Sequence, residues 1–408
     1  MTLFPVLNIT IAFLLIIGKT TCISAGKSIA CDGVIQVHDQ QDLDGLQNCP
    51  TFSGTIAIIS TSLKSLIIPH VQNLRGTIDV QNNAFLEMIA VPHLKNANNF
   101  VLNENRALNI VDVPSMTQAT TFNINGAPSL KSINFPSRLG QIGNLELSNT
   151  GVRELNGVDA KAINSLRLTN NANLENVSLT NTKSIGSISL SNNAKNGLHF
   201  DAQNLDELGE GEFKSLASTS LPSLTKVKSS LTFSENSMKS LEIPKLSEIG
   251  GTLKIISNDG LKSTAFPELA HIGGTLLLTN NPQLDDINGF PKLANVDAAV
   301  DVTGSFNKMS MPSLREVRGG MNVQSSSNEF KCDAINGLKG NVVKGDDDNF
   351  ACASGVTSPK PRISKIKADN AKTDESKKVD EKPANKDSII DNVEEEKKKK
   401  KKSDGDTR

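Results

Sequence analysis

The chain has 408 residues, of which 37% are hydrophobic and 21% charged, and its formal net charge is −1. This length can bury a large core, and the balanced charge gives no reason to expect nucleic acid as a partner. Trp and Tyr are absent and Phe supplies all the aromatic content, so the exposed amphipathic rings on which sugars and bases commonly stack are not available.

The first segment is typical of an export signal. An apolar run from Leu3 to Ile17 is too short to span a membrane comfortably, and the small residues Ser24-Ala25-Gly26 follow it. We predict a secretory signal peptide over residues 1–25 and no transmembrane segment after its cleavage. An uncleaved anchor helix is the alternative.

Cysteine usage agrees with export. Four cysteines follow the predicted signal peptide, namely Cys31, Cys49, Cys332 and Cys352. An even number in an exported chain predicts disulfides. Because the two pairs lie at opposite ends of a repeat array, Cys31–Cys49 and Cys332–Cys352 are the expected bonds. A zinc site is the alternative, but no CxxC or His spacing supports it.

Between the cysteine pairs, one sequence pattern returns about every 22 residues. The step from Ile188 to Leu231 is 43 residues, which is two periods, so one copy has lost its pattern. A repeat of this length, present about thirteen times, predicts a solenoid. The first apolar residues of the copies are Ile56, Ile78, Phe100, Phe122, Leu145, Leu166, Ile188, Leu231, Leu253, Leu276, Val300 and Met321.

Each copy reads as a short strand with one inward face. Its first and third residues are apolar and the residue between is usually polar, as at Glu146 and Arg167, which we expect to be cross-strand neighbours. A Gly two residues ahead of the strand implies a corner with positive φ or a close backbone approach. An Asn ends the strand in seven copies, and stacked Asn side chains can satisfy backbone groups that a turn leaves unpaired.

A second strand follows and ends at a proline in several copies, as in Leu66–Pro69 and Leu241–Pro244. Two strands and a short third side predict an all-β fold, a right-handed parallel β-helix of about thirteen coils. A leucine-rich-repeat horseshoe is the alternative. We expect an N-terminal cap over 26–54, with a strand at Val34–Val37 and a short helix from Gln40 to Asn48, then coils over 55–330 and a C-terminal cap over 331–354.

From Gly355 to Arg408 the composition changes abruptly. This segment has sixteen Lys and Arg, twelve Asp and Glu, and no Leu or Phe, and it carries the lysine run Lys397 to Lys402. We predict a disordered, charged tail over 355–408. The lysine run could bind an anionic surface, or it could be a solvated end neutralised by the adjoining glutamates.

The caps carry a family resemblance. The segment Asp42-Leu-Asp-Gly-Leu-Gln-Asn-Cys-Pro-Thr-Phe-Ser-Gly-Thr-Ile56 resembles the opening of a receptor L domain. Together with Phe330-Lys-Cys332 and Val342-Val-Lys-Gly345, the array is similar to fungal GPI-anchored cell-wall organisation glycoproteins of the sporulation and extracellular-matrix type. The resemblance implies a secreted, non-enzymatic wall or surface protein whose partners are wall polysaccharide or other wall proteins.

Two features bear on that resemblance. The family implies a GPI anchor, which the charged end of this chain, lacking an apolar tail, does not support. The family is also glycosylated, and Asn176-Val-Ser178 is the only acceptor sequence after the predicted signal peptide. We expect Asn176 to face outward and carry a glycan, since Val177 and Leu179 take the inward positions.

A search for catalytic chemistry finds no candidate. Polysaccharide-cleaving β-helices need acids gathered on one strand face, whereas no two acids are neighbours among the outward strand positions. We therefore predict no catalytic, cofactor or metal residues, and a protein that is not an enzyme. The alternatives are a polysaccharide-degrading β-helix enzyme and an L-domain-type ligand-binding ectodomain.

Two further features could take part in recognition. His70 and His93 occupy equivalent Pro-His positions and should stack, which could bind metal or sense pH, or could be two ordinary surface histidines. The copy without the pattern, near Glu210, could be a protruding recognition loop or a tolerated insertion.

Overall fold

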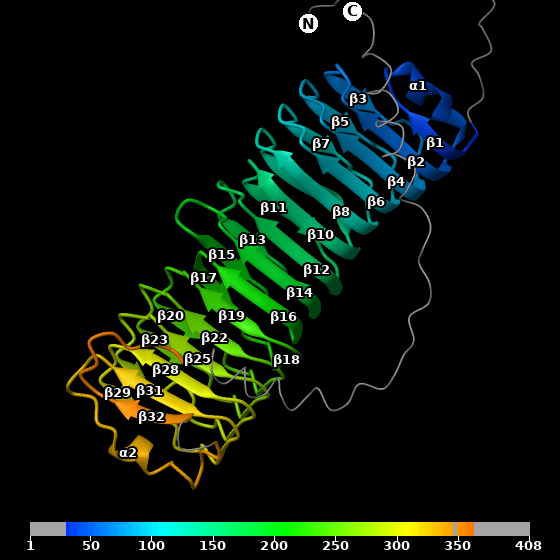
Figure 1. Cartoon of the computed structure of the whole chain (residues 1–408). Coiled ribbons are helices and arrows are strands. Elements are labelled where there is room, and N and C mark those ends of the chain that lie inside the picture. Colours follow the sequence, from blue (N-terminus) through cyan, green and yellow to red (C-terminus); the bar gives the residue numbers. More distant parts are fainter. Residues whose placement is uncertain (1–29, 346–348, 363–408) are drawn as a thin grey trace, which may run out of the picture. The chain divides into compact units, whose positions relative to one another are not determined.

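The computed structural model describes residues 30–345 and 349–362. Within them the chain winds into a solenoid whose coils stack one on the next, from the blue first coil to the orange last one (Figure 1). Strands of neighbouring coils pair in parallel, which joins them into one sheet of 20 strands and five smaller sheets. The predicted all-β parallel β-helix of about 13 coils is confirmed, with two strand-bearing sides where a horseshoe would have one.

The large sheet forms the first side of every coil. In the N-terminal coils its strands are long and bend around a corner, whereas in the C-terminal coils the same path is divided into a two-residue strand and a longer one. The long strands are β1 Asp32–Gln36, β2 Thr51–Ile59, β4 Asn73–Gln81, β6 Asn96–Asn103, β8 Gln118–Ala127, β10 Gln141–Thr150, β12 Ala162–Thr169, β14 Ser184–Ser191 and β16 Glu207–Lys214. The divided ones are β18 Lys226–Val227, β19 Leu231–Ser234, β21 Glu248–Ile249, β22 Leu253–Ile256, β24 His271–Ile272, β25 Leu276–Thr279, β27 Asn295–Val296, β28 Val300–Gly304, β30 Glu316–Val317 and β31 Met321–Ser325, with β32 Phe350–Ala353 added at the end.

The second side of the coils is made of shorter strands in the smaller sheets. Several of them stop before a proline, as the sequence predicts, because proline has no N–H to donate to a sheet, whereas β9 runs through Pro136. These strands are β3 Ser65–Ile67, β5 Met88–Ala90, β7 Ile110–Asp112, β9 Ser132–Leu139, β11 Glu154–Val158, β13 Asn176–Ser178, β15 Leu198–Asp201, β17 Leu216–Ser220, β20 Ser240–Glu242, β23 Ser263–Ala265, β26 Asp286–Ile287 and β29 Lys308–Met309.

The core lies inside the coils and is built from like residues stacked on like. The first apolar residues of successive strands pair directly, for example Leu253 with Leu276, and both are fully buried. The largest core side chains are phenylalanines, and several stack in neighbouring coils, such as Phe213 on Phe233 with ring centroids 4.9 Å apart. Each fully buried Phe stabilises the fold by about 1.5–3 kcal/mol through removal of its ring from water.

The predicted asparagine stack is present and buried. Asn258 accepts hydrogen bonds at Oδ1 from the backbone N–H (3.0 Å) and Nδ2 (2.9 Å) of Asn236, and its own Nδ2 donates to the Phe233 carbonyl (3.2 Å) and to Asn281 Oδ1 (3.0 Å). The paired asparagines have different tasks. Asn280 turns the chain with a left-handed φ of 55°, and Asn281 enters the stack. The stack therefore satisfies backbone groups that each turn would leave unpaired.

Close contact between coils explains the glycine ahead of the strand. A Cβ added to Gly54 would lie 1.9 Å from the Gly33 carbonyl oxygen, and one added to Gly76 would lie 1.9 Å from that of Gly54. No side chain fits at such a distance. Gly54 also has a φ of 144°, whereas Gly76 is required by the close approach alone.

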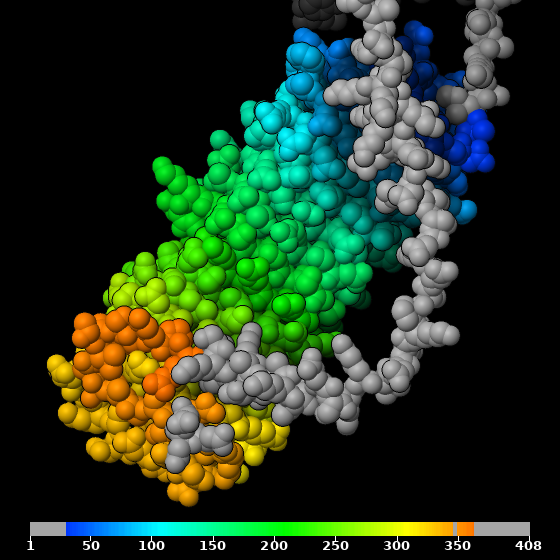
Figure 2. Space-filling model, in the orientation of Figure 1, coloured from blue at the N-terminus to red at the C-terminus, as the bar shows by residue number. Residues whose placement is uncertain are grey.

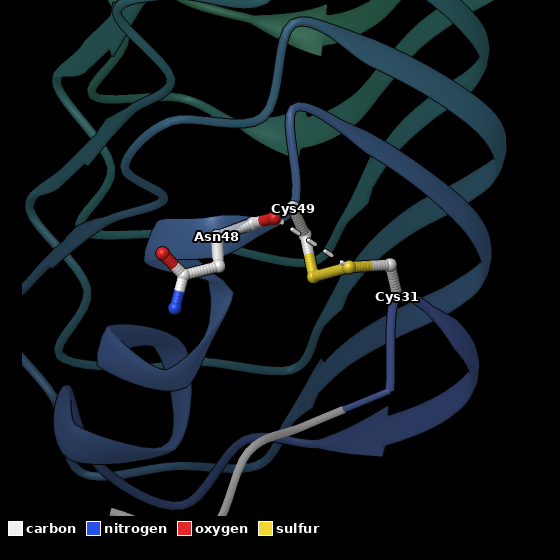
Figure 3. Close-up of a disulfide and its surroundings, with 3 residues drawn as sticks. All are labelled: Cys31, Asn48 and Cys49. Atoms are coloured by element: carbon white, nitrogen blue, oxygen red, sulfur yellow. Dashed lines mark hydrogen bonds between the residues drawn. A yellow bond between two sulfur atoms is a disulfide. The ribbon is translucent and has the colours of Figure 1, made fainter.

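The N-terminal end is closed by two short helical turns, α1 Gln41–Asp44 and η1 Gly45–Asn48, where the sequence predicted one helix. Leu43 and Leu46 are fully buried there and cover the first coil. The Cys31–Cys49 disulfide ties β1 to the end of η1, and the Asn48 carbonyl oxygen lies 3.8 Å from Cys31 Sγ (Figure 3).

The edge of β3 is covered by a single side chain of this cap. The Gln40 amide donates to the Ile67 carbonyl (2.7 Å) and accepts from the Ile67 N–H (2.9 Å). It imitates the backbone of a further strand, and so blocks an edge at which another chain could otherwise pair.

At the C-terminal end the chain forms α2 Asp333–Asn336, then returns as β32, which pairs with β31. The Cys332–Cys352 disulfide joins these two segments. The structure therefore contains both predicted disulfides. The predicted signal peptide over 1–25 and the lysine run Lys397 to Lys402 lie outside the described residues.

Candidate functional site

The predicted histidine pair is present on the surface of the first coils. The His70 and His93 rings stack with centroids 6.1 Å apart, beside a cavity of about 310 Å³ that Gln47, Pro50 and Gln72 also line. Structural zinc sites use four protein ligands and catalytic ones three. Within 30–345 and 349–362, no group of three or more His, Cys, Asp or Glu is placed to hold a metal ion. Among these described residues, no carboxylate or thiolate joins the two imidazoles in a metal-binding group.

The copy without the pattern near Glu210 is a regular coil, so the predicted loop or insertion is wrong. β16 pairs in register with β14 and β19, and Gly211 stands opposite Ile188 and Leu231, where other coils have an apolar residue. The missing side chain leaves no void, because side-chain atoms of Phe213, Leu208 and Leu231 lie within 2.8–2.9 Å of where its Cβ would be. The pattern was hidden because neighbouring residues fill the glycine's place.

Some charges on the outer face of the large sheet pair with the opposite charge in the neighbouring coil. Glu146 and Arg167 are register partners, as predicted, with Oε1 and Nε 3.6 Å apart. Lys226 Nζ lies 2.9 Å from Glu248 Oε2. Among the strand pairs in the described parts of the chain, no register sets one acid directly opposite another. Each acid therefore has a cation or a neutral residue beside it, and such exposed pairs contribute about 0–1 kcal/mol each.

A denser charged group lies on the two-residue strands. Asp297 Oδ2 lies 3.1 Å from His271 Nε2 and its Oδ1 lies 3.3 Å from Arg318 Nη1, while Arg318 Nε lies 3.4 Å from Glu316 Oε2. The group is partly exposed, which fits a surface network of ion pairs.

The predicted acceptor Asn176 starts β13 on the outer face of the second side. It is exposed, whereas Val177 and Leu179 are buried, which is the alternation that the sequence predicted. Its register partner is His199 on β15.

The predicted disordered tail begins at residue 355, but its first eight residues are hydrogen-bonded across the large sheet. Residues 355–362, here called the strap, follow the last disulfide and lie on the surface of the yellow C-terminal coils (Figure 2). The Arg362 N–H donates to Asp301 Oδ2 (2.7 Å), and Asn322 Nδ2 donates to Asp301 Oδ1 (2.8 Å) and to the Lys360 carbonyl (3.1 Å).

The strap lowers the solvent exposure of the outward strand positions that it contacts. Asp301 and Asn322 occupy outward positions, yet they are 0% and 1% exposed. Leu277, the outward residue one coil earlier, is also buried. The apolar Leu277 at an outward position fits a face that is partly covered.

Comparison with known proteins places the chain in a family. It is 31% identical over 340 residues to a cell surface GPI-anchored protein of Arthroderma benhamiae, covering 82% of this chain and 86% of that one. It is 33% identical over 327 residues to the cell wall mannoprotein PST1 of Saccharomyces cerevisiae, covering 80% and 72%. The chain belongs to this family of fungal cell-surface and cell-wall proteins.

Other members of the family include the protein ecm33 of Aspergillus fumigatus, 29% identical over 344 residues, with 80% of this chain and 81% of that one covered. No protein-family model and no solved structure matches the chain. The predicted resemblance to fungal cell-wall proteins is thus confirmed, and so is the predicted extracellular location at the cell wall or cell surface. Within the described ranges, none of the helices combines the length and apolar content needed to cross a bilayer.

Proposed function

We propose that the chain is a non-enzymatic, secreted glycoprotein that supports the organisation and integrity of the fungal cell wall. The observation that carries this proposal is its identity of 31–33%, over most of its length, to proteins named for the cell surface and the cell wall. Its proposed partners are wall polysaccharide and other wall proteins.

The use of the repeated residues supports a scaffold role. The asparagines of the repeat are buried and bonded to one another and to backbone carbonyls, and the glycines are required by contact between coils. The features that recur are therefore engaged in holding the solenoid together. What remains for recognition is the outer surface, where coils differ.

Deletion of the gene tests the proposal. We expect the deletion strain to lose viability in hypo-osmotic medium and in the presence of wall-binding dyes, and the full-length secreted chain to restore resistance. Normal resistance of the deletion strain in both conditions would overturn the proposed role in wall integrity.

We also propose that Asn176 carries an N-linked glycan, because it is exposed at the start of β13 within an acceptor sequence. Mass spectrometry of the protein secreted by a fungal host should find the glycan on the peptide that contains Asn176. The Ser178→Ala variant should lack it. An unmodified Asn176 in the secreted wild-type protein would contradict this assignment.

A further inference from the structure

The strap forms one wall of a groove on the C-terminal coils. The groove has a volume of about 320 Å³, and its other wall is made by the turns that follow β25, β28 and β31. Each of these turns and the strap contribute uncharged polar groups. The exposed side chains that supply them include Asn280, Ser305, Ser326, Thr357 and Ser358.

The strap is fixed on both sides of the groove. On the N-terminal side of the groove, the N–H of Val356 in the strap donates to the Ser325 carbonyl (3.0 Å). After it, the Gln324 side chain pairs with both backbone groups of Lys360, donating to the carbonyl and accepting from the N–H at 3.3 Å each. Residues 357–359 therefore span the groove between two anchors, so a ligand would meet a wall that is already ordered, which lowers the entropic cost of binding.

The chemistry of the lining excludes an ionic ligand. Charged residues make up 21% of the chain, yet none of the eleven residues that line the groove is charged and none is aromatic. A charged ligand would lose water there without gaining an opposite charge. Hydroxyl and amide groups, in contrast, both donate and accept, and match a ligand that is rich in hydroxyl groups.

Two prolines complete the site. Pro282 lies in the turn after β25 and Pro359 in the strap, and both line the groove. Their rings offer apolar C–H surface against which the C–H face of a sugar ring can pack, in a chain that has no Trp or Tyr. The polar groups would then fix the orientation of the hydroxyls, as in other small-ligand sites.

We propose that this groove binds a short segment of an uncharged saccharide. The inference rests on the proposed function, and it names the part of the surface and the class of wall component involved. The volume is near the lower end of the range of about 300–1,000 Å³ for small-molecule sites, so only a short stretch of sugar units fits.

Direct titration of the full-length secreted chain tests the proposal. The probes are neutral hexasaccharides of β-1,3-linked glucose, β-1,4-linked N-acetylglucosamine and α-1,6-linked mannose, with an oligogalacturonate of the same length as the anionic probe. Calorimetry and saturation-transfer NMR measure binding. We expect at least one neutral probe to bind and the anionic probe to bind at least tenfold more weakly.

Variants locate the binding to the groove. Ser326→Glu and Ser358→Glu each place a carboxylate at an exposed groove position, and Ser62→Glu makes the same change at an exposed position in the first coils. We expect the two groove variants to weaken binding of the neutral probe at least tenfold and Ser62→Glu to leave it unchanged, with all three retaining the wild-type circular dichroism spectrum.

Three results would overturn the proposal: no binding of any neutral probe, equal binding of the anionic one, or full binding in both groove variants. The deletion strain separates this failure from failure of the proposed function. If the wild-type chain restores wall integrity but binds no neutral probe, the groove proposal is wrong and the proposed function stands.

Discussion

The buried asparagine stack allows a sharp prediction about stability. In the Asn258→Ala variant, the four hydrogen bonds of the Asn258 side chain are lost at a position that is 1% exposed. Two of the partner groups keep another bond, because Asn236 Nδ2 also donates to the Phe213 carbonyl and Asn281 Oδ1 still accepts from the backbone N–H of residue 258.

The remaining two groups differ. The backbone N–H of Asn236 loses the partner that the side chain supplied, whereas the carbonyl of Phe233 belongs to β19 and stays within the ladder that β19 forms with β22. A buried polar group left unpaired costs about 1–3 kcal/mol. We therefore expect Asn258→Ala to lower the free energy of unfolding by about 1–3 kcal/mol, the cost of one such group.

The matched control is Asn156→Ala on the outer face of β11. Asn156 Nδ2 also donates to an asparagine in the neighbouring coil, Asn134 Oδ1 at 3.0 Å, but in an exposed setting where water can replace the bond. The expected loss of stability is within about 0.5 kcal/mol. Urea unfolding followed by far-UV circular dichroism measures both variants, since the chain has no Trp or Tyr for fluorescence.

Hydrogen exchange supplies a local readout, because coils of a solenoid interact mainly with their neighbours and can open without global unfolding. We expect faster exchange in residues 231–281 of Asn258→Ala and unchanged exchange in residues 55–110. The reasoning is refuted if Asn258→Ala is no less stable than Asn156→Ala and exchange near the substitution is unaltered.

Three other predictions concern single sites. Gly211→Leu restores the residue type of the repeat but should destabilise the protein by about 1–3 kcal/mol, because its space is already filled; a higher urea midpoint would contradict this. Gln324→Met removes both hydrogen bonds between this side chain and Lys360 and should increase protease cleavage within 355–362, while the free energy of unfolding stays within about 0.5 kcal/mol of wild type. Unchanged cleavage would argue against strap anchoring. The backbone N–H of His38 donates to Asp42 Oδ2 (2.7 Å) and holds the pKa of this carboxyl below its usual value. The stabilising effect of this carboxylate is therefore present above the usual pKa of Asp and is lost as pH falls through its lowered pKa. Hydrogen exchange near α1 should rise below about pH 4 in the wild type and respond less to pH in Asp42→Asn. An equal response in the two proteins would contradict this.

The features predicted correctly from the sequence are those that recur in the coils because each coil packs against its neighbours in the same way. The inward apolar pair, the stacked asparagine and the glycine at the coil contact recur because each coil meets identical neighbours above and below it. Leu253 over Leu276 and Asn258 over Asn281 are consequences of that register. Periodicity exposes such residues without any knowledge of the tertiary fold.

Features that occur once could not be found in the same way. Gly211 hides a regular coil, since its apolar contacts come from neighbouring residues and leave no local pattern. The strap is held largely through backbone groups, such as the Arg362 N–H on Asp301, which composition does not reveal. The groove combines residues from three coils and the strap, so its uncharged lining exists only after folding.

The central claim is that this family member binds to and supports the wall without cleaving it. The most direct measurement incubates the purified full-length protein with isolated fungal walls, then assays the sedimented protein and the soluble reducing sugar. The account predicts that the protein sediments with the walls and that reducing sugar stays at the level of a protein-free control. Release of reducing sugar in proportion to added protein would contradict it.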